Sequence, residues 1–269
     1  MTETPIRFSG PVPDAYDSLL VPLIFAPFAE DMARRVAAIN PARLLEIAAG
    51  TGAVTRAIAV RLPDCAITAT DLNPGMLAVA ERRQPPAPPV RWQAADALNL
   101  PFGDASFDCA VCQFGVMFFP DRPHGMAEAR RVLVPGGHFL CNCWDRVEVN
   151  DPVPAIGAAL VEIFGTDAPD FMARIPHGYH DPVRIEHDLR QAGFSRIAIE
   201  TVTIPIRLGS PDEAAAAWCK GTPLRGEIES RGRDVEDVTA EVAAHLARRY
   251  GQGAFAGRIS AFVVTASDG

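Results

Sequence analysis

Three acidic side chains stand at the ends of short apolar segments in the first hundred residues. They are Glu46, Asp71 and Asp96. Each is followed by a turn or a helix start, so on a sheet of parallel strands all three would point into one crevice. A carboxylate can accept hydrogen bonds from two vicinal hydroxyl groups at once, which suits a ribose. The pattern therefore predicts a ligand that carries a ribose and an adenine.

A loop of small residues follows the first of these acids. It runs from Ala48 through Ala49, Gly50 and Thr51 to Gly52. Small side chains let a ligand approach main-chain amides, and the helix that follows offers its N-terminus to a carboxylate or phosphate. Asp71 lies 19 residues after Gly52, the spacing at which an acid on a second strand binds ribose hydroxyls.

A nucleotide-dependent oxidoreductase is the alternative from another class of protein. Its dinucleotide fingerprint needs a third glycine or alanine three residues after Gly52, and Thr55 stands there instead. A diphosphate would also be repelled by the carboxylate of Glu46 within the first strand. An amino acid with an ammonium group suits this acid better, so the sequence favours a smaller ligand than a dinucleotide.

Alternating strands and helices must position these residues. The expected strands cover residues 42–48, 65–72, 90–96, 107–115, 137–144, 195–208 and 258–266. The expected helices cover residues 28–39, 52–62, 73–83, 124–133 and 182–194, with an apolar helical stripe at Val235, Val238, Val242 and Leu246. Near-continuous apolar strands separated by helices predict a parallel sheet that is covered on both faces. The fold class is therefore α/β, a doubly wound sheet.

Composition limits the partners and the compartment. The net charge is −8 and the pI is about 5.3, so no nucleic-acid partner is expected. No apolar run approaches the roughly 18 residues of a membrane helix, and the first residues lack a signal-peptide pattern, so we expect no membrane partner and a cytoplasmic protein. We expect no metal site either, because Cys109 and Cys112, three apart on one strand, would point to opposite faces. A thiol-dependent role stays open as the alternative.

Five segments, taken in order, resemble the class I S-adenosylmethionine-dependent methyltransferases. They are LLEIAAGTG, TATDLNPGML, QAADALNLPFGDASFD, VCQFGVMFFPD and ARRVLVPGGHFL. The resemblance is closest to the type 11 group, which includes the ubiquinone/menaquinone-biosynthesis enzymes, and it covers residues 40–145 well and the C-terminal strands loosely. It implies a Rossmann-like seven-stranded sheet whose last strand is antiparallel, and S-adenosylmethionine as the cofactor, with S-adenosylhomocysteine as its product.

The resemblance also assigns the cofactor-binding residues. Glu46 and Ala48, Ala49, Gly50, Thr51 and Gly52 would hold the methionine end. Asp71 and Leu72, with Met76, would hold the ribose side, and Asp96 and Ala97 would face the adenine. Gln113, Phe114 and Gly115 would line the wall beside the methyl group. Ala48 stands where the family usually has a glycine, and it fits there if its φ is negative.

We expect one methyltransferase domain over residues 1–269. Its cofactor-binding core would span 28–145, followed by cover insertions at 146–180 and 209–232 and by a C-terminal helix and strand at 233–266. Tyr16 would belong to an N-terminal segment that closes over the cofactor, or it would simply pack against the fold. A base, if the acceptor needs one, would come from His177, Tyr179 or His180, although a histidine in such a loop is also a common surface group.

The sequence thus predicts methyl transfer to a small molecule by in-line displacement, in which positioning supplies much of the catalysis. Oxygen is the first expected target, and nitrogen or carbon follows. Carbon methylation of a quinone-type precursor and a non-catalytic cofactor-binding protein are the alternatives. The expected partners are a small-molecule acceptor and at most a second copy of the chain, as a monomer or homodimer.

Overall fold

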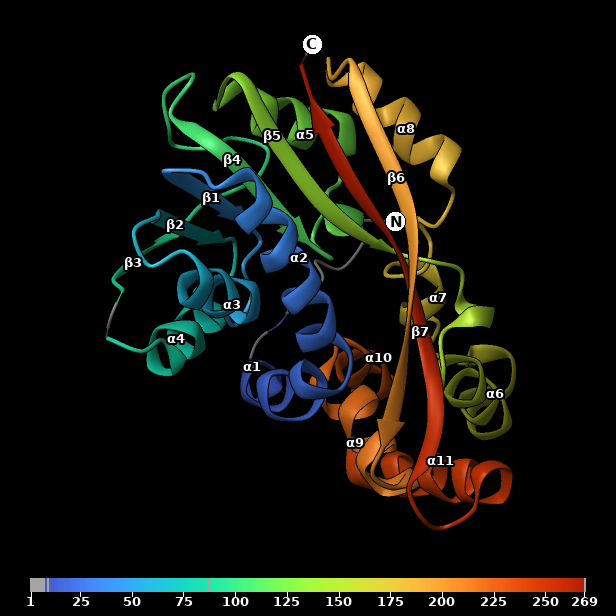
Figure 1. Cartoon of the computed structure of the whole chain (residues 1–269). Helices are drawn as coiled ribbons and strands as arrows, with labels where there is room; N and C mark the ends of the chain where they lie inside the picture. Colours follow the sequence, from blue (N-terminus) through green and yellow to red (C-terminus); the bar gives the residue numbers. More distant parts are fainter. Residues whose placement is uncertain (1–7, 9, 87, 269) are drawn as a thin grey trace.

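Seven strands form a single sheet in the order β3-β2-β1-β4-β5-β7-β6 (Figure 1). The structure, a computed structural model, describes residues 8, 10–86 and 88–268. The strands are β1 (Arg43–Ile47), β2 (Ala66–Asp71), β3 (Val90–Ala94), β4 (Phe107–Gln113), β5 (Leu133–Trp144), β6 (Arg196–Leu208) and β7 (Phe255–Ser267). Strands β1 to β5 pair in parallel, whereas β7 runs antiparallel to both β5 and β6. The predicted seven-stranded sheet with an antiparallel last strand is confirmed.

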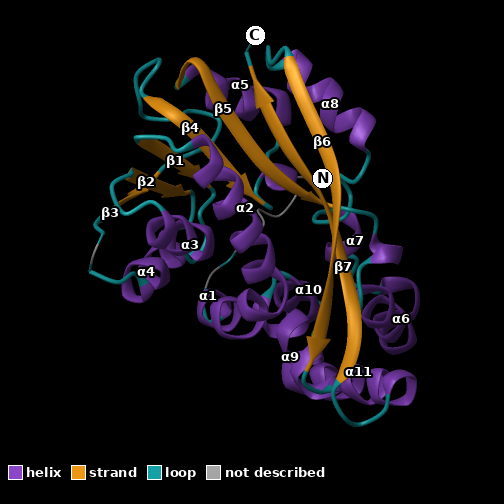
Figure 2. Ribbon diagram, viewed as in Figure 1, coloured by secondary structure: helices purple, strands orange, loops and turns teal. Residues whose placement is uncertain are grey.

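Helices cover both faces of this sheet (Figure 2). The longer ones in the core are α2 (Ala26–Ile39), α3 (Ala53–Arg61), α4 (Pro74–Arg83), α5 (Arg122–Arg131) and α8 (Pro182–Gln191). Buried side chains of α2 and α3 pack with β1 and β4 in one apolar cluster, and those of α5 and α8 pack in the other. Cys109 belongs to the first cluster and Cys112 to the second, so their predicted opposite orientation is confirmed.

The sequence placed the end of α5 too late. The helix ends at Arg131, and β5 begins at Leu133 and continues through Pro135, where we expected a helix stop. Leu133 pairs with Phe107 across an irregular register. Because this pairing gives the chain a sheet partner early, the Pro-Gly-Gly segment lies within an irregular strand and not in a loop.

An N-terminal helical segment precedes the core. It consists of α1 (Val12–Ala15) and the π-helix η1 (Tyr16–Phe25), which contains Pro22. A proline has no N–H to donate, so its position in a widened helix leaves one fewer donor unsatisfied. Residues Leu20, Val21 and Ile24 of η1 are buried. The sequence identified this segment only around Tyr16 and did not predict its π-helical form.

Strands β6 and β7 extend past the rest of the sheet as a two-stranded arm. The pairing of β7 with β5 ends at Ala261 and Trp144, whereas its pairing with β6 continues to Phe255 and Leu208. Figure 1 shows the helices of the cover gathered around this arm. They are α6 (Val153–Phe164), α7 (Phe171–Arg174), α9 (Pro211–Gly221), α10 (Leu224–Ser230) and α11 (Val235–Tyr250). The short helices η3 (Val147–Val149) and η4 (Gly165–Asp167) flank α6, whereas η2 (Val116–Phe118) follows β4 in the core.

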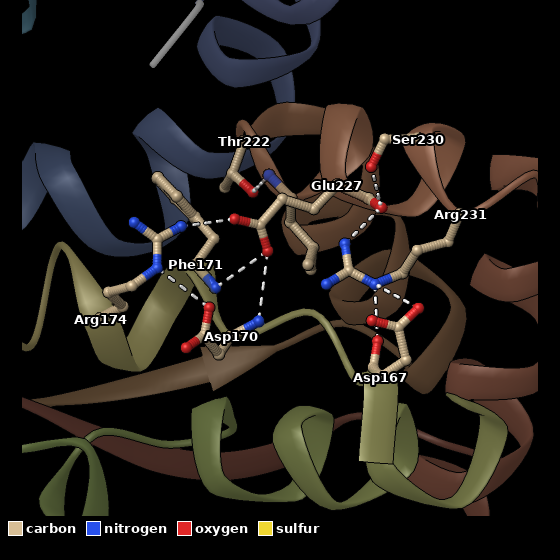
Figure 3. Close-up of polar contacts among 9 residues, drawn as sticks. Asp167, Asp170, Phe171, Arg174, Thr222, Glu227, Ser230 and Arg231 are labelled. Atoms are coloured by element: carbon tan, nitrogen blue, oxygen red, sulfur yellow. Dashed lines mark hydrogen bonds and ion pairs between the residues drawn. The ribbon is translucent and has the colours of Figure 1, made fainter. Parts of the chain in front are cut away.

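The predicted stripe on α11 is buried and packs against α9 and α6 of the cover. A polar cluster also joins the two halves of the cover (Figure 3). The Glu227 carboxylate of α10 accepts the backbone N–H groups of Asp170 and Phe171, each at 3.2 Å, and it pairs with Arg174 at 2.7 Å. Arg231 donates to the Asp167 carbonyl at 2.6 Å. The segments 146–180 and 209–232 therefore contact each other directly.

No helix among residues 8, 10–86 and 88–268 has both the length and the apolar character that crossing a membrane requires.

Candidate functional site

A small open hollow, with a cavity volume of about 30 Å³, lies between the N-terminal segment and the loop that follows β1. The side chains and backbone around it come from η1, β1, the loop, the start of α3 and the end of β4. The lining residues are Tyr16, Phe25, Glu46, Ala48, Ala49, Gly50, Thr51, Ala53, Val54 and Gln113. The structure thus brings together seven of the residues that the sequence assigned to the cofactor, at the carboxyl ends of the strands.

Asp71 fixes the loop from the end of β2. One carboxylate oxygen accepts the backbone N–H of Gly50 at 2.8 Å, and the other accepts that of Asn73 at 2.8 Å. Burial raises the pKa of Asp71 above its usual range, against these two hydrogen bonds, which lower it. Each oxygen keeps a second lone pair, so the acid can hold the loop and still accept from ligand hydroxyls.

The loop needs glycine at Gly52 for two reasons. Its φ is +79°, a left-handed conformation that side chains disfavour. A Cβ there would also lie 2.7 Å from the Trp92 ring. Gly50 has a φ of +57°, and the Met76 side chain of α4 lies directly beneath it. Met76 therefore supports the loop from below, and it is itself only 4% exposed.

Ala48 does not have the negative φ that we expected. Its φ is +55°, which costs an alanine about 1–2 kcal/mol. Its methyl group faces Gly115, where an added Cβ would lie 2.6 Å from that of Ala48. Gly115, which has no Cβ, therefore leaves room for the Ala48 methyl group. The positive φ at position 48 explains why the family usually has a glycine there.

Glu46 is a buried acid in the wall of the hollow. It is 2% exposed, and its carboxylate accepts a hydrogen bond from the Thr55 hydroxyl of α3. Burial raises the pKa of Glu46 to about 8, against the Thr55 hydrogen bond and the charge of Arg56, which lower it. A ligand cation would offset the cost of ionising this acid.

Thr51 supplies a second polar group that is unpaired in the protein. Its hydroxyl oxygen is buried in the wall of the hollow and has no hydrogen-bond partner, which costs about 1–3 kcal/mol. An acid, an orphaned hydroxyl and a loop of backbone amides together suit the ammonium and carboxylate groups of an amino acid. The residues present therefore fit the methionine end of the expected cofactor.

Leu72, expected at the ribose, and Asp96 and Ala97, expected at the adenine, lie on the neighbouring strand ends. Leu72 follows Asp71 directly and is 72% exposed. Asp96 and Ala97 follow β3, and the Asp96 carboxylate accepts the backbone N–H of Leu98 at 2.9 Å. None of these three residues lines the hollow, so the structure places them beside the site and not in its deepest part.

The end of β4 contributes one residue to the wall and one to the core. Gln113 lines the hollow, and its amide donates to the Phe25 carbonyl at 3.3 Å. Phe114 is 6% exposed and stacks on Trp144 with 3.9 Å between ring centroids. Its φ is +54°, uncommon for a bulky residue. Phe114 also packs against the lining residue Phe25, with 5.6 Å between ring centroids, and so supports the wall of the hollow from behind. Gly115 makes room for Ala48.

Tyr16 lies in the wall of the hollow. Its ring packs on that of Phe25 with 4.9 Å between centroids. Burial, followed by the charges of Asp71 and Asp17, raises the pKa of its hydroxyl. The sequence missed Phe25, because nothing in the apolar run before α2 distinguishes it from the buried Ile24 beside it.

The three candidate bases lie outside the hollow. Tyr179 is 1% exposed and donates its hydroxyl to Asp188 at 2.7 Å. His177 is buried, its Nδ1 donates to the Asp145 carbonyl at 2.7 Å, and burial lowers its pKa to about 4. His180 is bonded through Nδ1 to the His177 carbonyl at 2.6 Å. The structure does not bring these side chains to the wall that contains Glu46.

Comparison with known proteins finds one matching family, described as Methyltransferase domain, over residues 45–141. The demethylmenaquinone methyltransferase of Deinococcus radiodurans is 32% identical over 169 residues, which cover 58% of this chain and 68% of that protein. The ubiquinone/menaquinone biosynthesis C-methyltransferase UbiE of Methylobacterium nodulans is 39% identical over 120 residues, covering 44% and 48%. The matches thus span 68% of the length of the first relative and just under half of the second.

Two solved structures share the fold at low sequence identity. The YcgJ protein from Bacillus subtilis superimposes with a TM-score of 0.59 at 18% identity, covering 90% of this chain and 99% of that one. The Haemonchus contortus phosphoethanolamine N-methyltransferase 2, in complex with S-adenosyl-L-methionine, gives 0.57 at 16% identity, covering 96% and 57%. These similarities support the arrangement of the sheet and helices.

Proposed function

Because the chain belongs to the S-adenosylmethionine-dependent methyltransferases of the type 11 group, we propose that it methylates a small hydroxylated aromatic acceptor of the quinone-precursor type at a ring carbon. The observation that carries the cofactor half of this proposal is the hollow with its buried Glu46 and orphaned Thr51 hydroxyl. The names of the relatives, all quinone-pathway methyltransferases, support the acceptor half.

The cofactor would lie across the ends of β1, β2 and β3. Glu46 would bind its ammonium group, and the Thr51 hydroxyl and the loop amides would bind its carboxylate. Asp71, held by Gly50 and Asn73, would accept from the ribose hydroxyls, and the exposed Leu72 would pack on the adenine. S-adenosylmethionine supplies an electrophilic methyl group when bound. The protein therefore has to position the acceptor and exclude water more than it has to activate the methyl donor.

Two aromatic side chains line the hollow, and two buried aromatic rings pack behind one of them. Tyr16 and Phe25 line it, and Phe25 also lies 5.6 Å from Phe114 and 5.9 Å from Trp144, centroid to centroid. Faces of this kind bind a planar ring through apolar and edge-to-face contacts. A flat aromatic acceptor is therefore favoured over a flexible aliphatic one.

A ring that carries an ionised hydroxyl can react at oxygen or at the adjacent carbon. The atom held in line with the methyl group decides the product, so positioning sets the choice. The sequence favoured oxygen as the target, and O-methylation is the second candidate here. A small rotation of the same acceptor would place its oxygen instead of its carbon in line with the methyl group. We assign no base to His177, because its lowered pKa of about 4 makes it a poor proton acceptor at neutral pH.

The test is a labelled-methyl assay with purified protein, S-adenosylmethionine and a set of acceptors: a reduced demethylquinone analogue, a simple naphthol, a catechol and an aliphatic amine. Transfer to the first, with the methyl located on carbon by NMR, would support the proposal. An O-methyl product would select the second candidate. Transfer to the amine alone would refute an aromatic acceptor, and failure to bind S-adenosylhomocysteine would refute the cofactor site itself.

A further inference from the structure

The N-terminal segment Val12–Phe25, here named the strap, forms one wall of the hollow through Tyr16 and Phe25. A bulky ligand held behind this wall must pass it on entry or release. The contacts that hold the strap to the core therefore bear on how fast a ligand exchanges. Two acidic side chains of the strap, Asp14 and Asp17, make such contacts.

Asp17 is the buried one of the two. Its side chain is 5% exposed, next to Tyr16 in the chain, and one carboxylate oxygen lies 2.8 Å from Arg83 Nε in α4. The other oxygen, Oδ1, has no hydrogen-bond partner. The Arg56 guanidinium of α3 lies 3.7 Å from Oδ1, beyond hydrogen-bond reach. A buried carboxylate oxygen left in this state is costly.

Arg56 also contacts the ligand-binding loop. Its Nη1 donates to the Thr51 carbonyl at 2.6 Å, and a Cβ built on Gly52 would lie 3.2 Å from the same nitrogen. One guanidinium thus contacts the loop through Nη1 and faces the strap through Nη2. A small shift of the loop would move Arg56 relative to Asp17 Oδ1.

We propose that Asp17 and Arg56 are positioning residues that couple closure of the strap to occupancy of the loop. Binding at the loop brings Arg56 Nη2 into hydrogen-bond distance of Asp17 Oδ1, which fixes Tyr16 over the ligand. Release then requires this ion pair to separate. The inference rests on the cofactor site proposed above, and it adds a residue pair that controls exchange of that cofactor.

Asp14 provides a matched control on the same segment. It also pairs with an arginine of α4, Arg82, but the two side chains are 70% and 59% exposed. Exposed ion pairs contribute little. Asp14→Asn therefore removes the same charge from the same strap without touching the buried contact.

The experiment measures the dissociation rate of S-adenosylhomocysteine by stopped-flow displacement, for the wild-type protein and for Asp17→Asn and Asp14→Asn. We expect Asp17→Asn to raise the rate about tenfold, the scale of one lost charged hydrogen bond, and Asp14→Asn to change it less than about twofold.

Thermal unfolding of the ligand-free proteins separates positioning from stability. If Asp17→Asn lowers the melting temperature but leaves the dissociation rate within twofold of the Asp14→Asn rate, Asp17 is only structural and the proposal is overturned. If Asp17→Asn does not fold, Arg83→Gln replaces it. This change removes an exposed partner of the Asp17 carboxylate, and its dissociation rate is compared with that of Asp14→Asn in the same way. Absence of wild-type binding would instead overturn the cofactor site.

Discussion

Replacing Glu46 by glutamine tests the central acid of the site. Glutamine keeps the length of the side chain and an oxygen that can accept the Thr55 hydroxyl, but it cannot ionise. Glu46 is 2% exposed, and burial raises its pKa from 4.5 to about 8. Because the folded and unfolded chains then hold different numbers of protons, the stability of the wild type depends on pH and that of the variant lacks this contribution.

The sign follows from the raised pKa. Below pH 4.5 both states hold the proton, and Glu46 contributes no pH dependence. As pH rises toward 8 the unfolded chain releases the proton while the folded chain keeps it, so the wild type loses about 1.4 kcal/mol per pH unit. At pH 7 the accumulated loss is about 3 kcal/mol, and at pH 8, where the folded chain has itself released half of its proton, it is about 4 kcal/mol. The advantage of Glu46→Gln over wild type therefore grows across this range.

Urea unfolding of both ligand-free proteins between pH 5 and pH 9, followed by circular dichroism, measures this difference. At any single pH, the difference in unfolding free energy between Glu46→Gln and wild type also contains the cost of burying the amide N–H donors of glutamine. The change of this difference with pH is therefore the informative quantity. The exposed Glu81→Gln variant controls for removal of one acid. Parallel stability curves for wild type and Glu46→Gln would refute a raised pKa of Glu46.

The same substitution has the opposite effect on cofactor binding. At pH 7 Glu46 must lose a proton before it can pair with an ammonium group, which costs the wild type about tenfold in affinity. Calorimetry of S-adenosylhomocysteine in buffers of different ionisation enthalpy should show release of roughly half to one proton by the wild type, and little by Glu46→Gln, together with weaker binding. Equal proton release by both proteins would remove Glu46 from the ammonium site.

Three further substitutions test separate parts of the structure. Ala48→Gly should raise the free energy of unfolding by about 0.5–1 kcal/mol in urea titrations, because it relieves the φ of +55° at some cost in chain entropy. Asp71→Ala should weaken S-adenosylhomocysteine binding by about 1.5–3 kcal/mol in calorimetry, and unchanged affinity in a folded variant would remove the ribose assignment. Glu227→Gln should speed amide hydrogen exchange at Asp170 and Phe171, because the Glu227 carboxylate accepts their backbone N–H groups. Glu229→Gln on the same helix should not, because Glu229 pairs with Arg225.

The sequence by itself determined the framework of the site. The alternation of apolar strands with helices, and the acids at the strand ends, predicted the sheet and the edge at which its residues meet. Glu46, Asp71 and the loop between Ala48 and Gly52 were identified in this way, because strand ends and glycine loops follow from local patterns of a few residues. The order of motifs also identified the family before any contact was known.

Other features depended on contacts between distant segments, which local patterns do not contain. Thr55, noted in the sequence only as a missing glycine, donates to Glu46 once the first turn of α3 lies over β1. The positive φ of Ala48 could not be foreseen, because it is tolerated only where Gly115 leaves space. In the sequence nothing distinguishes Asp17 from an ordinary surface acid, whereas in the structure α3 and α4 place Arg56 and Arg83 beside it.

The candidate bases show the same division most clearly. His177, Tyr179 and His180 have the right chemistry for a base and lie in one short loop, so the sequence grouped them. The fold instead binds their polar atoms to Asp145, Asp188 and the His177 carbonyl, away from the hollow. Residue type is encoded locally, whereas burial and hydrogen-bond partners are set by tertiary packing, and it is these that decide whether a titratable group can reach a ligand.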